Sequence, residues 1–407
     1  MMGPPPADAE RLAERFGTPL YVFDGAAAAR AAEDFQAAWS PRDTVAYSLK
    51  CNPLVGLVTR LAATGCATEV ASGFEYRIAR RAGLPGPRIV FNGPLKRPDE
   101  LARALREGAT IVLDGADQVR AAAAAAGLAA PETRVGLRLT PPWREKTDRF
   151  GIPVRMASAA ARMLARAGLA PTGLHMHLGA YQLGPLPPSG PPIHGVSVEY
   201  PVPVERFARM ARALREVAER IGGIEWLDLG GGWPAPWDLA EHVSAVEAAL
   251  GPDRLPLILE PGRALIRDAG WLLVRVVARR GRGAAVVDAG VTQVPCVLWK
   301  RSPVLPALPR DGRERPTDLY GPLCLQHDAI AREVSLPPVA EGDLLWIGQT
   351  GAYAISQASP FIHPRAGAVM LEGESAVMLR FPETDEEALG PQAEPLLTGP
   401  EQRPMPV

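Results

Sequence analysis

Eight short segments rich in β-branched and apolar residues alternate with helical patterns over residues 44–262, and this alternation limits the possible folds more than any other feature of the chain. Strands that alternate with helices build parallel sheets, because each helix returns the chain to the edge where the next strand begins. The predicted strands are TVAYSL (44–49), CATEVA (66–71), RIVFNG (88–93), TIVLDG (110–115), RVGLRL (134–139), GLHMHLG (173–179), EWLDLGG (225–231) and LPLILEPG (255–262).

The segments between these strands have the three- and four-residue spacing of amphipathic helices. In PDELARALREG, Pro98 suits the first turn of a helix and Gly108 its C-terminal end. The segment PVERFARMARALREVAERIGG places five apolar residues on one stripe: Phe207, Met210, Leu214, Val217 and Ile221. Eight strand–helix units in roughly 220 residues predict an α/β fold, a (β/α)8 TIM-like barrel. An open doubly wound sheet is the alternative, since alternation alone does not show that a sheet closes.

The chain changes character after residue 270, where short apolar runs are separated by Pro- and Gly-rich turns. These runs are WLLVRVVARR, GAAVVDAG, DLLWIGQT, AGAVML and AVMLRF, and they predict a second domain that is mainly β. The isolated strand TPLYVFD (18–24) is expected to return to it. The predicted domains are a barrel over residues 25–265, a mainly-β barrel domain built from 1–24 and 266–382, and a flexible tail at 383–407.

Two Pro-rich segments are longer than ordinary connections. Residues 181–200 and 301–318 show no clear strand or helix pattern. Long structureless loops in compact domains are usually functional lids or disordered inserts. We expect both segments to be irregular, and the first, which follows the strand bearing His177, to shape a substrate pocket.

The charge balance and the cysteines exclude several classes of protein. With 44 basic and 45 acidic side chains the formal charge is −1, so the chain is not a nucleic-acid-binding protein that works through excess positive charge. It has neither a secretory signal pattern nor 18 consecutive apolar residues, so no membrane partner is expected. Its four cysteines include no C-x-x-C pair, which argues against a disulfide framework or a thiolate zinc site and favours the cytoplasm.

In a (β/α)8 barrel the residues that carry chemistry lie at the C-terminal ends of the strands. Lys50 directly follows the first predicted strand, and its neutral amine can form a Schiff base with an aldehyde cofactor. A strand-end lysine directed to the surface is the alternative. Gly230, Gly231 and Gly232 can bring backbone N–H groups to a phosphate, or can simply form a flexible turn. Arg263 in LEPGR would supply a second phosphate partner.

Two carboxylates and two histidines complete the candidate set. Glu260 can keep a pyridine nitrogen protonated, which makes the ring an electron sink, or it can belong to a barrel salt bridge. Glu69 lies in the second predicted strand. His175 and His177 form an H-x-H pattern that can bind metal, but no third ligand follows at a recognisable spacing. Ring stacking or core packing is therefore favoured, and no metal is expected.

Nine motifs, in order, connect the chain to a known family. They are AYSLKCNP, TEVASGFE, FNGPLK, GLHMHLGA, LDLGGG, LEPGR, VVDAG, GPLCLQHD and GAYAISQAS. The set resembles the fold-type III pyridoxal-phosphate decarboxylases, the diaminopimelate and ornithine decarboxylase family, over nearly the whole chain. This resemblance implies a pyridoxal 5'-phosphate cofactor and the removal of the α-carboxylate of an amino acid. The barrel and β domain of that family agree with the fold predicted from periodicity.

The resemblance also implies roles for individual residues. Lys50 would carry the cofactor as a Schiff base, His177 would stack on its ring and Glu260 would pair with the ring nitrogen. Cys324 or Lys50 would return a proton to the α-carbon. In this family the cysteine comes from the neighbouring subunit, which implies a homodimer with shared active sites. The expected cofactor contacts are Lys50, Glu69, His177, Gly230, Gly231, Gly232, Glu260, Gly262, Arg263 and Tyr353.

The positions expected to contact the substrate differ from the family pattern. These positions are Cys296, Leu325, Gln326, His327 and Asp328. Family members that act on free diamino acids usually have an acidic residue directly after the cysteine, where this chain has Leu325. An apolar side chain cannot pair with a desolvated ammonium without a penalty. Ala180 stands where a phosphate-binding serine is usual.

We therefore hypothesise that the substrate is not free diaminopimelate, lysine or ornithine. An amino acid with a neutral far end is expected, or one that is conjugated or tethered to a carrier, as in secondary metabolite pathways. Three alternatives stay open. They are diaminopimelate decarboxylation in lysine biosynthesis, a racemase or epimerase that uses the same cofactor, and a non-catalytic homologue that binds pyridoxal phosphate.

Overall fold

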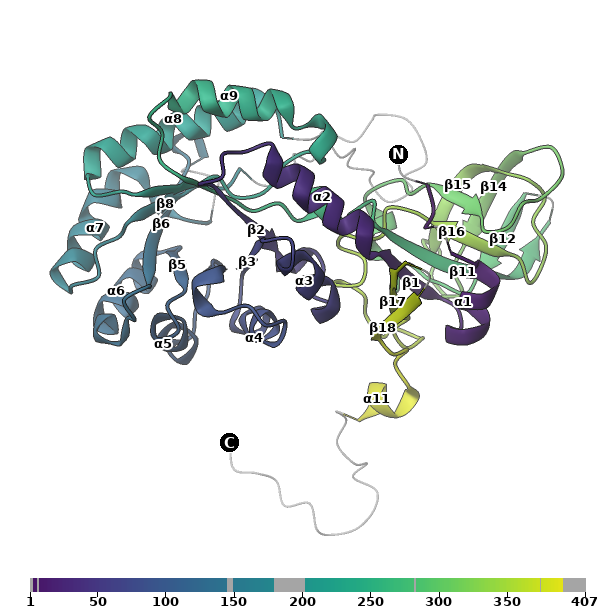
Figure 1. The fold of residues 1–407 in the computed structure, drawn as a ribbon. Coiled ribbons are helices and arrows are strands. Elements are labelled where there is room, and N and C mark those ends of the chain that lie inside the picture. The colour runs from purple at the N-terminus through teal and green to yellow at the C-terminus, as the bar shows by residue number, and fades with distance from the viewer. Residues whose placement is uncertain are drawn as a thin grey trace, which may run out of the picture.

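Two nine-stranded sheets organise the computed structural model, which describes residues 3–5, 7–144, 149–178, 202–281, 283–373 and 375–390. In Figure 1 the first sheet is surrounded by helices, and the second forms a β-rich domain beside it. The predicted combination of a TIM-like barrel and a mainly-β domain is confirmed.

All eight predicted barrel strands are present, and they are parallel. Their bounds are β2 (Thr44–Ser48), β3 (Ala67–Val70), β4 (Ile89–Phe91), β5 (Thr110–Leu113), β6 (Arg134–Thr140), β8 (Gly173–His175), β9 (Trp226–Asp228) and β10 (Leu257–Leu259). The sheet closes because β5 pairs with β6 and β10 pairs with β2. Closure excludes the open doubly wound sheet. A short strand, β7 (Ile152–Pro153), pairs with β6 outside the ring.

Helices cover the outside of the barrel in Figure 1. Their bounds are α2 (Gly25–Ala37), α3 (Val55–Ala62), α4 (Gly73–Arg81), α5 (Pro98–Arg106), α6 (Ala116–Ala124), α7 (Ala157–Arg166), α8 (Val204–Ile221), α9 (Ala240–Leu250) and α10 (Arg263–Ile266). Four residues of the stripe predicted in α8 are buried: Phe207, Met210, Leu214 and Val217. Pro98 begins α5 as predicted, and Gly108 follows its end with a φ of 72°, a conformation that glycine adopts without strain.

The side chain of Trp226 fills the floor of the barrel. It is completely buried and packs in one cluster with inward residues of other strands: Ala46, Ala67, Val90, Val112 and Ile258. A Cβ on Gly173 of β8 would lie 2.0 Å from Trp226 Cε2, and one on Gly136 of β6 would lie 2.5 Å from Trp226 Cη2. The indole therefore requires both glycines, and it closes the barrel below the polar groups described next.

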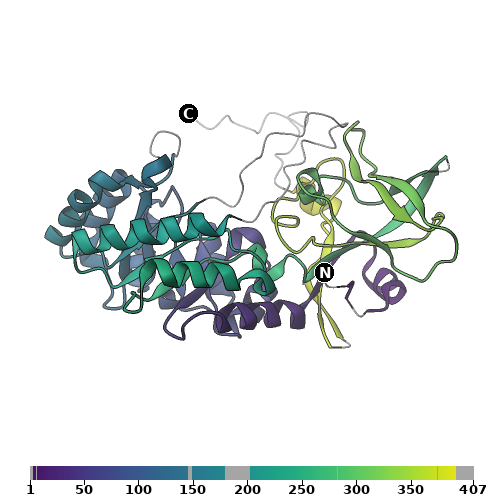
Figure 2. The same ribbon diagram turned by 90° about the horizontal axis from the view of Figure 1, so that it is seen from above.

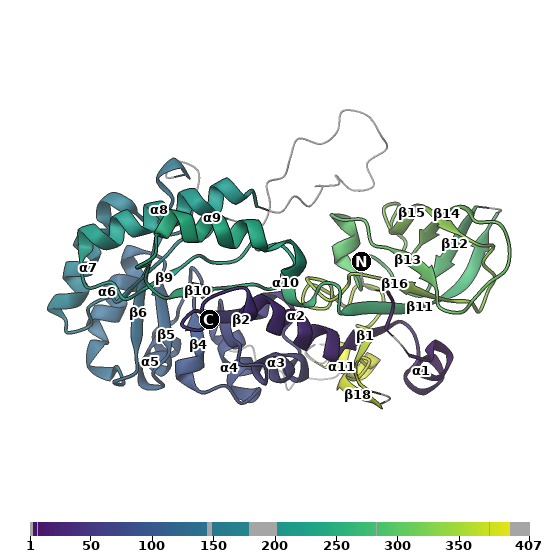
Figure 3. The same ribbon diagram turned by 45° about the horizontal axis from the view of Figure 1, so that its top comes forward.

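The second sheet takes strands from both ends of the chain. Its members are β1 (Leu20–Asp24), β11 (Gly270–Arg280), β12 (Ala284–Val287), β13 (Val304–Pro306), β14 (Arg315–Tyr320), β15 (Ala329–Leu336), β16 (Leu344–Ile347), β17 (Gly367–Glu372) and β18 (Ser375–Arg380). β1 lies between β11, its antiparallel partner, and β17, its parallel partner. The helix α1 (Ala9–Phe16) packs on the same sheet. Figures 2 and 3 show this domain beside the barrel, with α10 leading into β11.

The prediction that residues 301–318 are structureless is wrong. This segment contains β13 and the first residues of β14. Among the described strands, β13 pairs only with β16. A proline such as Pro306 is tolerated in an edge strand, because one side of such a strand makes no ladder hydrogen bonds. The Pro-rich pattern predicted a loop, although a strand at the edge of a sheet can contain proline.

The C-terminal region begins with a helical turn. α11 (Asp385–Leu389) starts at a capping box formed by Thr384 and Glu387. The region predicted as a flexible tail, residues 383–407, therefore begins with a short helix. The rest of that tail from residue 391 on, the long segment 181–200 and Ala180 lie outside the described residues. Within the part of the chain that is described, no helix combines the length and the apolar character needed to cross a membrane.

Candidate active site

A ring of polar side chains lies directly above the barrel floor. Each strand, or the residue that follows it, contributes one side chain two positions beyond its floor residue, because alternate residues of a strand face the same side. We call this set the polar ring: Ser48, Glu69, Asn92, Asp114, Arg138, His175, Asp228 and Glu260. All are buried except Arg138, whose side chain is 13% exposed. Ionisable groups are costly to bury unless they are paired, so their partners indicate what the ring can do.

Lys50 adjoins the ring on η1 (Leu49–Cys51), a 3-10 turn that follows β2. Its Nζ donates hydrogen bonds to Ser48 Oγ at 2.5 Å and to Glu69 Oε2 at 2.6 Å. Burial alone would lower the pKa of Lys50, but Glu69, Tyr353 and Glu260 together outweigh it, with Glu69 the largest of the three, and the pKa is raised. The same ion pair lowers the pKa of Glu69 in spite of its burial. The Lys50 side chain is 41% exposed, so a ligand at the barrel mouth can reach the amine.

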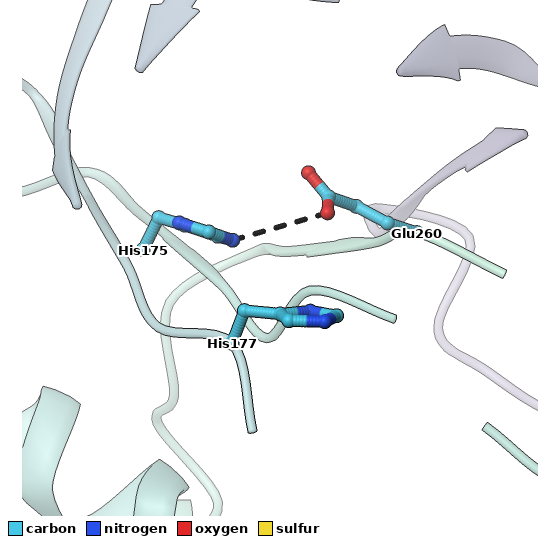
Figure 4. Close-up of side chains that lie close together, drawn as sticks. All are labelled: His175, His177 and Glu260. Atoms are coloured by element: carbon cyan, nitrogen blue, oxygen red, sulfur yellow. Dashed lines mark ion pairs between the residues drawn. The ribbon is translucent and has the colours of Figure 1, made fainter. Parts of the chain in front are cut away.

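Glu260 follows β10 and is buried between two other ring members. Asn92 Nδ2 donates to Glu260 Oε1, and His175 Nε2 lies 3.8 Å from Glu260 Oε2 (Figure 4). Burial raises the pKa of Glu260 to about 7, and the nearby Glu69 adds to the rise. Burial also lowers the pKa of His175 well below its ordinary value, so that imidazole is neutral. The described partners of the Glu260 carboxyl are therefore an amide and a neutral imidazole.

His177 presents an oriented aromatic ring next to these groups. The Gly231 N–H donates to His177 Nδ1 at 3.0 Å, so a neutral ring carries its proton on Nε2. The rings of His175 and His177 are nearly parallel, with an interplanar angle of 21° and centroids 6.4 Å apart. Figure 4 shows both rings beside Glu260. One nitrogen of each ring and one Glu260 oxygen lie within 4.8 Å of one another.

The glycine loop after β9 brings its backbone close to these side chains. Gly230 and Gly232 have φ values of 62° and 98°, which favour glycine. A Cβ on Gly230 would lie 2.5 Å from His177 Nδ1, and one on Gly231 would lie 2.8 Å from the Glu260 carbonyl oxygen. The loop thus exposes backbone, rather than side chains, beside the ring, as an anion-binding cradle requires.

Arg263 and Tyr353 meet where the barrel contacts the β domain. Arg263 begins α10, and its guanidinium carbon lies 5.3 Å from the centre of the Tyr353 ring. The Tyr353 N–H donates to the Cys51 carbonyl oxygen at 2.9 Å, which links the β domain to the turn that carries Lys50. A Cβ on Gly262 would lie 3.1 Å from Cys51 Sγ, so the LEPGR segment packs against that turn. The junction offers an anion both a cation and a hydroxyl group.

The segment between β14 and β15 carries most of the expected substrate contacts. Cys324, Gln326 and His327 are exposed, whereas Leu325 is half-buried and packs against the hydrophobic core. A thiol in this position is accessible from outside the chain. The structure therefore allows Cys324 to act in the site of another copy of the chain.

Two expected substrate contacts are internal instead. Asp328 is buried, and its oxygens accept the N–H groups of Leu323 at 2.7 Å and Val291 at 2.8 Å. It therefore holds the Cys324 segment in shape. Cys296 in η7 (Pro295–Leu298) is completely buried. The side chains of Asp328 and Cys296 are enclosed by the protein and are therefore not accessible to a substrate.

The chemistry of these residues fits pyridoxal phosphate. Among the described residues, buried polar atoms of three ring members have no hydrogen-bond partner: both ring nitrogens of His175, Asn92 Oδ1 and Asp228 Oδ2. The unpaired atoms of His175 and Asn92 are expected where a polar ligand completes a site. Lys50 provides an amine for an aldehyde, Glu260 a carboxyl for a basic ring nitrogen, and the glycine loop a backbone surface for a phosphate.

Most of the polar ring was not predicted from the sequence. The members missed are Ser48, Asn92, Asp114, Arg138 and Asp228. Their signal is a polar residue two positions beyond an apolar residue or a glycine near the end of each strand. That signal becomes informative only when the strands are known to close, because closure turns eight separate strand ends into one layer.

Comparison with known proteins adds sequence relatives of known activity. The family model described as pyridoxal-dependent decarboxylase, pyridoxal binding domain, matches residues 26–183. A diaminopimelate decarboxylase of Deinococcus radiodurans is 34% identical over 396 residues, which cover 92% of this chain and 96% of the relative. A diaminopimelate decarboxylase of Neisseria meningitidis serogroup B is 30% identical over 407 residues, which cover 93% of this chain and 94% of the relative.

Solved structures with the same fold are also similar over most of their length. Diaminopimelate decarboxylase of M. jannaschii, in co-complex with L-lysine, superposes with a TM-score of 0.83 at 24% identity and covers 95% of each chain. The Helicobacter pylori enzyme complexed with L-lysine has a TM-score of 0.82 at 22% identity, covering 94% of this chain and 98% of that one. At these identities the likeness concerns the fold alone.

Proposed function

Since this chain belongs to the fold-type III family of pyridoxal-phosphate-dependent decarboxylases, we propose that the polar ring and the residues around it form an active site for an amino acid. The far end of this amino acid is neutral, conjugated or tethered to a carrier. Family membership follows from the 34% identity to a relative matched over almost its full length. The chain is accordingly a pyridoxal-phosphate-dependent amino-acid decarboxylase, a carboxy-lyase. The site assignments and the substrate class are our proposals.

The placement of Lys50 and Glu260 supports the site more than any other observation. β2 and β10, the strands that these residues follow, are neighbours in the barrel. The two side chains are close enough for each to shift the pKa of the other. One cofactor ring needs an amine for its aldehyde and a carboxyl for its nitrogen on the same side of the fold, and these two residues meet that requirement.

Residues around the mouth would hold the cofactor by its different groups. Lys50 would hold the aldehyde carbon, Glu260 the ring nitrogen and His177 the ring face. The phosphate would be held by the backbone of Gly232 and Gly262, with Arg263 and Tyr353. Gly230 and Gly231 would give the phosphate room, since their N–H groups already donate to Asp228 and His177. When bound, pyridoxal phosphate supplies a sink for the electrons left on the α-carbon after carbon dioxide departs.

The proton of Lys50 has an acceptor in place. An ammonium is not a nucleophile, and the bond to Glu69 at 2.6 Å holds Lys50 in that form. Glu69 is also the carboxylate bonded directly to Nζ. We assign to it the proton that leaves Lys50 when the amine acts, so that an N–H bond is broken and an O–H bond is formed within the pair.

Cys324 is the proposed proton donor to the α-carbon. Thiols can act as general acids, and this one is exposed on the β domain. We propose a homodimer in which Cys324 of each chain completes the site of the other. All four cysteines lie in the described part of the chain and none forms a disulfide, which agrees with the proposed cytoplasmic location.

The substrate class rests on Leu325 and Gln326. Leu325 directly follows Cys324, at the position where family members acting on free diamino acids usually carry an acid, and Gln326 comes next. Leu325 is half-buried and packs against the core, so it offers no partner to a charged amine.

The second candidate is meso-diaminopimelate, because the relatives at 34% and 30% identity are named diaminopimelate decarboxylases.

A spectroscopic titration tests the cofactor site. Pyridoxal phosphate is added to the purified protein, and the change in its visible absorption on binding is recorded. We expect Lys50→Ala to abolish this change and Lys300→Ala, in a lysine outside the site, to retain it. An unchanged signal in Lys50→Ala would reject Lys50 as the residue that holds the cofactor.

A substrate screen tests the proposed specificity. Release of carbon dioxide is followed with meso-diaminopimelate, lysine and ornithine, and with both enantiomers of neutral and conjugated amino acids read by mass spectrometry. Turnover of a neutral or conjugated amino acid is expected. Robust turnover of meso-diaminopimelate would favour the second candidate and reject the first. Exchange of the α-proton in deuterated water without carbon dioxide release would instead identify a racemase.

A further inference from the structure

Asp228 is a member of the polar ring to which no role has yet been assigned. It ends β9, is completely buried, and its Oδ1 accepts the Gly230 N–H at 2.8 Å. Among the described residues no donor reaches its Oδ2. Asp228 is paired with Ile258, two residues before Glu260, in the register of β9 and β10, and the Glu260 N–H donates to the Gly230 carbonyl oxygen at 3.0 Å, so the two acids are neighbours in the ring. Two carboxyl groups can form a hydrogen bond only if one of them carries a proton.

The other charged groups of the ring also indicate that one of these two carboxyl groups carries a proton. Two ring acids have a cation beside them, and these ion pairs are Lys50–Glu69 at 2.6 Å and Arg138–Asp114 at 3.2 Å. For Asp228 and Glu260, the described ion pairs include only the contact of Glu260 with His175 at 3.8 Å. Because burial keeps His175 neutral, it supplies no positive charge. Two adjacent buried carboxylates without a counter-ion cannot both ionise cheaply.

We propose that Asp228 is a positioning residue that keeps a proton on Oδ2 and donates it to Glu260, so that Glu260 faces the cofactor ring nitrogen as a single, fixed negative charge. This inference rests on the proposed function and extends it to a residue behind the cofactor contact. The Gly230 N–H occupies Oδ1, which leaves Oδ2 to carry the proton.

The surroundings decide which of the two acids is protonated. Burial and Glu69 raise the pKa of Glu260, but the Lys50 ammonium and the hydrogen bond from Asn92 offset part of that rise. Burial raises the pKa of Asp228 well above its ordinary value, and the neighbouring Glu260 raises it further. The anion is therefore better stabilised on Glu260. The other charged or titratable groups around the pair are Lys50, Glu69, Lys96, Arg134, Arg138, His175 and His177.

The affinity for pyridoxal phosphate tests whether residue 228 donates a hydrogen bond to Glu260. The amide introduced by Asp228→Asn can still accept the Gly230 N–H through its oxygen and can donate to Glu260 through its nitrogen. We expect Asp228→Asn to bind pyridoxal phosphate within about threefold of the wild type. Asp228→Ala, which cannot donate, should bind it about tenfold or more weakly, the effect of losing one hydrogen bond to a charged group. The absorption titration described above measures both constants.

The pH dependence of the apoprotein tests the proton without the cofactor. A carboxyl whose pKa is raised by folding takes up a proton when the chain folds, so its contribution to stability falls as pH rises above the unfolded value of about 3.9. Asp228→Asn removes this dependence. The melting temperature of Asp228→Asn minus that of the wild type should therefore increase between about pH 6 and pH 8. Groups that do not interact with Asp228 cancel in this difference, and Glu260, which does, belongs to the pair that is tested.

The same substitution at another ring acid is the matched control. Asp114→Asn removes the partner of Arg138 and should lower the melting temperature to a similar extent at both pH values. The inference is overturned if Asp228→Asn binds the cofactor as weakly as Asp228→Ala, or if its difference from the wild type does not change with pH. If Asp228→Ala does not fold, the pH comparison alone decides. Failure of the wild type to bind cofactor would reject the proposed function and leave the apoprotein result valid.

Discussion

At the scale of single residues, Lys50 has to meet two opposite requirements. Its contacts with Ser48 and Glu69 hold it as an ammonium next to a buried carboxylate. Capture of an aldehyde requires the neutral amine. The ion pair thus places the amine accurately and also limits how much of it is reactive at a given pH.

We expect Glu69→Gln to move cofactor capture to lower pH. Loss of the carboxylate removes the charge that raises the pKa of Lys50, while the burial that lowers this pKa remains. More of the amine is then neutral at a given pH. The rate of the absorption change after mixing apoprotein with pyridoxal phosphate, recorded between about pH 6 and 9, measures the shift.

An acid outside the barrel is the control for this prediction. Glu107 pairs with Arg103 on the outer surface, so Glu107→Gln should leave the pH profile of cofactor capture unchanged. An identical profile in Glu69→Gln and the wild type would mean that another group sets the protonation state of Lys50.

At the scale of elements, the barrel floor determines where the site can be. Trp226 fills the space that a side chain on Gly136 or Gly173 would occupy, and the polar ring begins one inward residue above it. The floor thus separates an apolar layer from a polar layer within the same short strands. Small residues on two strands accommodate one large residue on a third, as dense packing of an interior requires.

Gly173→Ala is therefore expected to destabilise the barrel. The new Cβ would lie 2.0 Å from Trp226 Cε2, so the indole or the strand has to move. Overpacking of this kind typically costs about 1–3 kcal/mol, measured here as the free energy of unfolding in urea. Gly127→Ala is the control, because nothing lies within 4 Å of a Cβ at that position. Equal stability of the two variants would contradict this description of the floor.

At the scale of the whole molecule, the site depends on contacts between the domains. Asn52 Nδ2 donates to the Gly351 carbonyl oxygen at 3.0 Å, and Ser356 Oγ donates to the Cys51 carbonyl oxygen at 3.1 Å. With the Tyr353 bond, these contacts fix the β domain against the turn that carries Lys50. The proposed dimer adds a second copy, whose Cys324 would enter from outside.

Mixing of two inactive variants tests these shared sites. Lys50→Ala and Cys324→Ala should each be inactive on a substrate that the wild type decarboxylates. After subunit exchange, half of the dimers would be mixed, and each mixed dimer would have one intact site of two, which predicts about a quarter of wild-type activity. Samples of each variant treated alone are the controls. No recovery of activity in the mixture would contradict a site built from two chains.

The sequence by itself determined the eight strands, their helices and the amine, carboxyl and glycine loop at the strand ends, because periodicity and strand-end position are local properties. It did not identify β13, because the proline in that strand, Pro306, is compatible with a strand only at a sheet edge. Nor did it identify five polar residues near strand ends, since a single polar residue there has many possible explanations: Ser48, Asn92, Asp114, Arg138 and Asp228. Only the closed barrel decided their role: closure places eight strand ends around one interior, where each buried charge must find a partner among the others.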